Sequence, residues 1–124
     1  MRISVMVILL LLALAQPANP QSEISIINSV EPAAGRIGDM FLAQGVYLNQ
    51  ERVAALYMTD GATDIRVVIL EQTSTSIRFR IPPEAKPGRF ALMILTKGKE
   101  PKLMEEPVRI IIQPETTGSA LLYG

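Results

Sequence analysis

The stretch ISIINSVEPAAGRIGDMFLAQGVYL, residues 24–48, contains two extended apolar runs joined by a bend that is rich in proline and glycine. Pro32 cannot donate a hydrogen bond to a sheet ladder, and Gly38 readily adopts backbone angles that other residues resist. This spacing predicts a strand over about 24–30, a bend, and a second strand over 39–44. Such an opening is typical of a β-sandwich.

The rest of the chain continues as short strands separated by turn residues. Ile77, Phe79 and Ile81 alternate with Arg78 and Arg80, which predicts a strand with one buried and one solvent-exposed face. Further strands are expected over 52–58, 64–71, 90–95 and 108–112, with an irregular charged segment over 100–107. Because no helical period lasts more than a turn or two, we expect an all-β, immunoglobulin-like β-sandwich of about seven strands.

The composition indicates one folded domain without a strong electric field. The chain has 124 residues, of which 48% are apolar and 19% charged, and its formal net charge is zero. This length supports a single core, and the apolar fraction excludes wholesale disorder. Without a basic excess the chain has nothing to attract a phosphate backbone, so we expect no nucleic-acid partner.

Residues 1–15 resemble an export signal, with Arg2 followed by an apolar run and small residues at Ala13 and Ala15. Cleavage is expected after Ala15, with Ala18 as the alternative position. The other interpretation is a membrane anchor, but the run is shorter than the roughly 20 residues that span a bilayer. We therefore expect an exported protein, periplasmic or extracellular, with no stable membrane insertion after cleavage.

The remaining chain divides by composition into three segments. Residues 16–23 carry two prolines among small polar residues and are expected to form an extended leader. Residues 24–113 form the expected domain, and residues 114–124 a flexible tail. The absence of Cys leaves no lipoprotein anchor and no disulfide framework, which suits a bacterial cell envelope.

Turn glycines and core positions recur in one pattern over about residues 24–112. Its positions are Ile27, Val30, Pro32, Gly35, Gly38, Gly45, Leu48, the run from Ser76-Ile77 to Ile81-Pro82, Gly88 and Phe90. This pattern resembles the IPT/TIG domain, the immunoglobulin-like domain shared by plexins and transcription factors, in a bacterial exported single-domain form. The resemblance implies a binding, spacing or dimerising module instead of an enzyme.

The residue types exclude the commonest catalytic and metal chemistry. The chain has neither His nor Cys, so it cannot build Ser-His or Cys-His nucleophiles or the usual zinc sites. Asp60 and Asp64 flank a turn glycine and could hold calcium, although two carboxylates fall short of its six to eight oxygen ligands; ordinary turn chemistry is the alternative. Glu105 and Glu106 would point to opposite faces of an extended chain, which disfavours an acid-base pair. We assign no catalytic, cofactor-binding or metal-binding residue and expect no enzymatic activity.

Aromatic and basic side chains offer two weaker hypotheses. Tyr47 and Tyr57 are the candidates for exposed sugar-stacking rings, because the three phenylalanines fall on expected core positions; the other interpretation is that they cover sandwich edges. An accessory carbohydrate-binding module is therefore the alternative function. Arg66, Arg78 and Arg80 would form a basic stripe for an acidic partner if their strands were neighbours, or else a solvated face paired with nearby Glu.

A set of apolar residues on the expected outer face is the main functional signal. A sandwich needs only one apolar face per sheet, so either the phase is wrong on some strands and these residues are core, or the outer face binds something. We expect a binding or self-association module of the cell envelope, whose partner is another envelope or surface protein or the protein itself. The residues of this expected protein-binding face are Met40, Leu42, Val68, Leu70, Met93 and Leu95.

Overall fold

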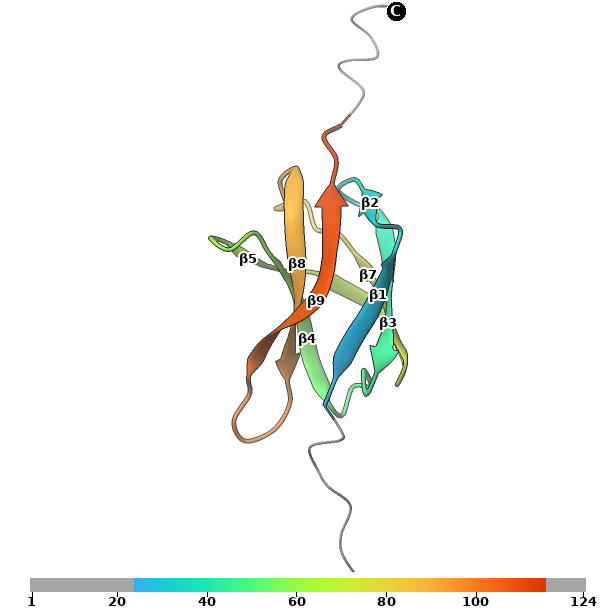
Figure 1. Cartoon of the computed structure of the whole chain (residues 1–124), viewed down its shortest axis with the longest axis vertical. Helices are drawn as coiled ribbons and strands as arrows, with labels where there is room; N and C mark the ends of the chain where they lie inside the picture. The colour runs from blue at the N-terminus through green and yellow to red at the C-terminus, as the bar shows by residue number, and fades with distance from the viewer. Residues whose placement is uncertain (1–23, 116–124) are drawn as a thin grey trace, which may run out of the picture.

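A computed structural model describes residues 24–115, which form a two-layered β-sandwich without helices in that range (Figure 1). The expected signal peptide, the leader, and residues 116–124 of the tail lie outside the described residues. The strands are β1 (Ile26–Glu31), β2 (Ala34–Gly35), β3 (Met40–Val46), β4 (Val53–Thr59), β5 (Asp64–Arg66), β6 (Val68–Gln72), β7 (Ser76–Arg80), β8 (Gly88–Thr96) and β9 (Leu103–Ile112).

The nine strands form two sheets. The four-stranded sheet has the order β1-β3-β7-β6, and the five-stranded sheet has the order β2-β9-β8-β4-β5. All paired strands are antiparallel except β2, which runs parallel to β9. The all-β sandwich predicted from the sequence is confirmed, with nine strands in place of about seven.

One predicted strand, 64–71, is two strands that belong to different sheets. β5 pairs with β4 in the five-stranded sheet, whereas β6 pairs with β7 in the four-stranded sheet. The chain crosses at Val67, whose side chain is buried and whose N–H donates to the Leu56 carbonyl at 3.0 Å. The side chains keep alternating through the crossing, so the sequence pattern shows no break there.

A bulge sets which side chains of the first strand face inward. Ile27 is fully buried, whereas Ile24 and Ile26 are exposed. The pairing of β1 with β3 shifts register between Ile27 and Ser29, and such a bulge reverses which side chains face inward. Ile27 and Val30, two of the positions that match the IPT/TIG pattern, therefore both face the core.

Two glycines in the opening stretch are required by the backbone. Gly45, where the second strand was expected to end, lies within β3, which continues to Val46. A Cβ at Gly45 would lie 1.8 Å from the Ile26 carbonyl oxygen, so only glycine allows β1 to approach at this point. Gly38 has φ of 89°, which suits the bend before β3.

The last strand starts earlier than predicted. β9 begins at Leu103, so part of the segment expected to be irregular is strand. Pro107 lies where the pairing with β8 shifts register, and a bulge is one of the few places where a sheet accepts proline. Arg109 Nη1 donates to the Glu106 and Val108 carbonyl oxygens at 3.3 and 3.1 Å, which satisfies the carbonyls that the bulge displaces.

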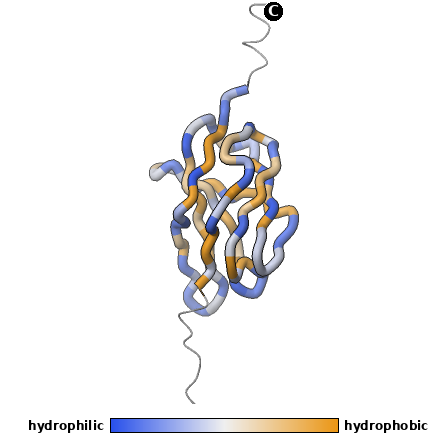
Figure 2. Tube along the Cα trace, turned by 45° about the vertical axis from the view of Figure 1, so that its right-hand side comes forward, coloured by the Kyte–Doolittle hydropathy of each residue, from blue (hydrophilic) through white to orange (hydrophobic). Residues whose placement is uncertain are grey.

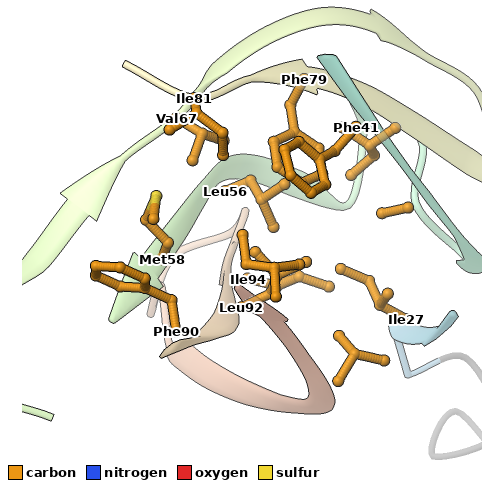
Figure 3. Close-up of a cluster of buried hydrophobic side chains, with 14 of the residues drawn as sticks. Ile27, Phe41, Leu56, Met58, Val67, Phe79, Ile81, Phe90, Leu92 and Ile94 are labelled. Carbon is orange, nitrogen blue, oxygen red and sulfur yellow. The ribbon is translucent and has the colours of Figure 1, made fainter. Parts of the chain in front are cut away.

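The core lies between the two sheets, as the close-up in Figure 3 shows. Phe41 and Phe79 are register partners in the four-stranded sheet, and their rings stack with centroids 5.7 Å apart. They face Leu56 and Ile94 of the five-stranded sheet, and all four side chains are buried. Hydrophobic and hydrophilic positions alternate along much of the chain trace (Figure 2). The inward phases predicted for β3, β7 and β8 are confirmed.

Candidate functional site: the outer face of the four-stranded sheet

The outer face of the four-stranded sheet carries apolar side chains in water. On β3, Phe41 and Ala43 point into the core, so Met40 and Leu42 point outward. Met40 is the most exposed large apolar side chain of the described residues, at 51%, and Leu42 is partly buried. A single exposed apolar side chain is ordinary, but a group of them on one sheet calls for an explanation.

The edge strand β6 extends this apolar surface. Val68 is 47% exposed and lies in the same cross-strand row as Met40, with Arg80 of β7 between them. Leu70 is 37% exposed and lies where the pairing of β6 with β7 shifts register, between Ile69 and Glu71. Four of the six residues of the expected binding face therefore share one sheet.

The other two residues lie on the opposite side of the molecule. Met93 and Leu95 belong to β8 of the five-stranded sheet, where Phe90, Leu92 and Ile94 supply the inward side chains. They cannot form one surface with Met40 and Leu42, because the core separates the outer faces of the two sheets. The expectation of a single face holding all six residues is corrected on this point.

Met93 differs from the exposed residues in a second way. It points away from the core, yet only 7% of it is exposed. Its register partners on the two sides are Tyr57 of β4 and Glu105 of β9, and Glu105 is in turn paired with Arg109 at 3.4 Å. We attribute the burial of Met93 to these large neighbours, which leave it little surface for a partner. Leu95 is partly buried in the same sheet.

We name the outer face of the four-stranded sheet the Met40 face. It consists of two neighbouring cross-strand rows and the bulged residue of β6. Its residues are Met40, Arg80 and Val68 in the first row, Glu31, Leu42, Arg78 and Glu71 in the second, and Leu70.

The charges of the Met40 face are balanced, and only some of them are paired. Arg78 Nε donates to Glu71 Oε1 at 3.0 Å, across the β6–β7 pair. Glu31 and Arg80 are exposed and form no ion pair with any residue in 24–115. Sequence reasoning missed Glu31, because its place beside Leu42 follows from the register of β1 and not from its own strand pattern.

The basic stripe is interrupted. Arg78 and Arg80 share the outer side of β7, but Arg66 lies on β5 of the other sheet, where it pairs with Tyr57. Arg66 lines a groove of about 590 Å³ at the crossing between the sheets, together with Lys97 and Gln72. Gln72 Nε2 donates to the Leu48 and Val53 carbonyl oxygens at 2.8 and 3.2 Å, so its amide group joins the two sheets at this groove.

The two candidate tyrosines do not form a stacking platform. Tyr47 is half-buried, and the Arg52 guanidinium lies over its ring at 5.1 Å from the centroid. That ring face is therefore already occupied by a cation–π contact. Tyr57 is also half-buried and lies between Arg66 and Met93 in the five-stranded sheet.

The carboxylates considered for calcium or acid-base chemistry have structural roles. Asp60 Oδ1 accepts the N–H groups of Thr63 and Ala62 at 2.7 and 2.9 Å, and these two hydrogen bonds lower the pKa of Asp60. The group closes its own turn, while Asp64 begins β5. In the part of the chain that the structure describes, no three acidic, His or Cys side chains gather as metal ligands.

Glu105 and Glu106 point to opposite faces, as predicted. Glu105 is exposed, whereas Glu106 is 4% exposed and its Oε1 accepts the Ile27 N–H at 2.7 Å. Burial raises the pKa of Glu106, and the hydrogen bond from Ile27 opposes that rise. This carboxyl group joins β9 of one sheet to β1 of the other, a role that sequence reasoning missed.

No protein-family model and no curated protein matches the sequence. Three solved structures from Bacteroides resemble the fold. A Bacteroides thetaiotaomicron protein whose name carries the word phosphatase has a TM-score of 0.54 and 16% identity, over 79% of this chain and 20% of that one. An auxiliary nutrient binding protein from Bacteroides ovatus has a TM-score of 0.53 and 19% identity, over 79% and 22%. Another from Bacteroides thetaiotaomicron has a TM-score of 0.53 and 21% identity, over 73% and 21%.

The chain spans about a fifth of each of these proteins, and at such identities the likeness concerns the fold alone. Two of the three names describe binding proteins and one a phosphatase. Residues 24–115 contain no helix that is long and apolar enough to cross a bilayer.

Proposed function

We propose that the protein is a non-catalytic, exported binding or self-association module of the cell envelope, which engages a protein partner through the Met40 face. The observation that carries this proposal is the exposure of Met40, Val68 and Leu70 on one sheet whose inner face already fills the core. On a folded domain, a cluster of large exposed apolar side chains usually marks an interaction site.

Three further points support this proposal. The resemblance to IPT/TIG domains implies a binding, spacing or dimerising role. Two of the structurally similar proteins are named as nutrient binding proteins. Met40 also suits such a face, because an unbranched thioether chain adapts to partners of different shape.

The test is a crosslinking capture from the envelope fraction of the protein's own cells. Three forms of the full chain are compared: wild type, the double variant Met40→Lys with Val68→Lys, and Ile111→Lys. Ile111 is the matched control, because it is 48% exposed on a strand of the opposite sheet. Circular dichroism should show all three folded, since changes at exposed sites rarely alter stability by more than about 0.5 kcal/mol.

We expect wild type and Ile111→Lys to capture the same specific protein, and the double variant to lose it. Two lysines would place charge against an apolar contact and so remove most of the association. The proposal fails if the captured proteins are the same for all three forms, because the Met40 face would then have no part in binding.

A further inference from the structure

We propose that the occupant of the Met40 face is a second copy of this chain, packed face to face about a two-fold axis. This inference rests on the proposed function, because it concerns the same face. It follows from the way in which the two unpaired charges of the face are placed around its apolar centre.

The unpaired charges lie on opposite sides of β3. Glu31 is the register neighbour of Leu42 on β1, and Arg80 is the register neighbour of Met40 on β7. Neither forms an ion pair with any of the described residues, whereas Glu71 and Arg78 neutralise each other at 3.0 Å. The charge left for a partner is therefore one anion and one cation, diagonally across Met40 and Leu42.

This diagonal arrangement is complementary to itself. A two-fold axis that lies in the interface plane, passes between Met40 and Leu42, and is perpendicular to the diagonal from Arg80 to Glu31 places Arg80 of each copy opposite Glu31 of the other. An isologous interface of this kind needs one patch that matches its own image. A partner of a single charge sign would instead leave either Glu31 or Arg80 facing a like charge, which is unfavourable.

The size of the face sets the strength of the expected contact. Four strands about 4.8 Å apart, each contributing five to seven residues with a rise of about 3.3 Å, make a surface of roughly 400 Å² per copy. A total near 800 Å² is below the roughly 1,200–2,000 Å² of stable specific interfaces, so we expect a weak, reversible dimer at micromolar to millimolar concentration. The pair of charge contacts then decides register and orientation more than affinity.

The experiment is a charge exchange followed by sedimentation equilibrium of the purified protein over micromolar to millimolar concentration. We expect wild type to dimerise, and Arg80→Glu or Glu31→Arg alone to weaken the dimer at least about tenfold, because each variant opposes two like charges. An equimolar mixture of these two variants should restore a heterodimer, because both cross-pairs are then of opposite sign. Raising the salt concentration should weaken both the wild-type and the mixed dimer.

A second pair of variants separates charge pairing from any loss of fold. Arg80→Gln and Glu31→Gln remove the charge and keep a polar side chain. Each should weaken the dimer, and their mixture should restore it only in part, because the mixed dimer regains one of the two Glu31–Arg80 pairs while the charge-reversed mixture regains both. Circular dichroism checks that every variant is folded.

The proposed dimer is overturned if wild type stays monomeric to millimolar concentration, if the single charge reversals dimerise like wild type, or if their mixture fails to recover. If wild type is monomeric while capture from the envelope still depends on Met40 and Val68, the partner is not a second copy of this chain, but the proposed function stands. If capture is also independent of those residues, both proposals fail.

Discussion

The carboxyl group of Glu106 is buried between the edges of the two sheets. The bulge of β1 brings the Ile27 N–H toward β9, and Glu106 supplies the acceptor at 2.7 Å. A buried amide without a partner would cost about 1–3 kcal/mol, so this hydrogen bond stabilises the contact between the two sheets. The same burial makes the ionised carboxylate unfavourable, which raises the pKa of Glu106.

This raised pKa predicts a definite pH dependence of stability. The folded protein retains the Glu106 proton at pH values where the unfolded chain has already lost it. The Glu106 contribution to the free energy of unfolding is therefore largest below its ordinary pKa of 4.5. It falls as pH rises from there through the raised folded-state value. We expect Glu106→Gln, which keeps an oxygen for the Ile27 N–H, to remove this decline.

The measurement is urea unfolding of wild type and Glu106→Gln between acidic and neutral pH. Glu105→Gln is the control, since Glu105 is the adjacent exposed residue and should retain the wild-type slope. Parallel curves for wild type and Glu106→Gln would show that Glu106 does not titrate differently on folding.

At the scale of elements, one side chain joins the end of β6 to the start of β4 and the loop before it. Gln72 donates from its amide nitrogen to the carbonyls of Leu48 and Val53, where the edge of β4 has no neighbouring strand. The side chain takes the place of a strand in satisfying those acceptors.

We expect Gln72→Ala to lower the free energy of unfolding by about 1–3 kcal/mol, because two carbonyl groups lose their donor. Gln72→Glu should cost at least as much, since an ionised carboxylate of the same shape cannot donate. Gln50→Ala, an exposed amide at the same groove, should change stability by no more than about 0.5 kcal/mol. Thermal or urea unfolding that gives Gln50→Ala and Gln72→Ala equal costs would contradict this role.

The inward faces of β3, β7 and β8 could be predicted from the sequence, because every second residue on their inner side is apolar. The prediction failed where a bulge inserts a residue. At Pro107 the bulge hid the first half of β9, which was expected to be irregular. A bulge depends on what the neighbouring strand does, and alternation within one strand cannot reveal it.

The candidate site was predictable to the same extent. Met40, Leu42, Val68 and Leu70 were placed outward from their own strands, and the structure gathers them on one sheet. The separation of Met93 from this group could not be predicted, because alternation says which way a side chain points but not which sheet holds its strand. The crossing at Val67 places β6 in the four-stranded sheet, but it leaves the alternation of side chains unchanged.

At the scale of the whole molecule, the sheets are two halves of one core. Phe79 of the four-stranded sheet and Leu92 of the five-stranded sheet are both fully buried in a single cluster. The chain has no Cys, so no disulfide holds either sheet together by itself. Neither sheet can lose its partner without exposing its own inner face to water, so we expect both to unfold in one step.

This predicts that core truncations in opposite sheets act on the same transition. Phe79→Ala and Leu92→Ala should each lower the free energy of unfolding by about 2–5 kcal/mol, because each leaves a cavity in the shared core. The slope with urea should stay unchanged in a single transition. Ile111→Ala removes a similar apolar side chain from the exposed surface, so it should cost under about 1 kcal/mol. Circular dichroism and tyrosine fluorescence should give coincident curves, and two separated transitions in either core variant would mean that the sheets fold independently.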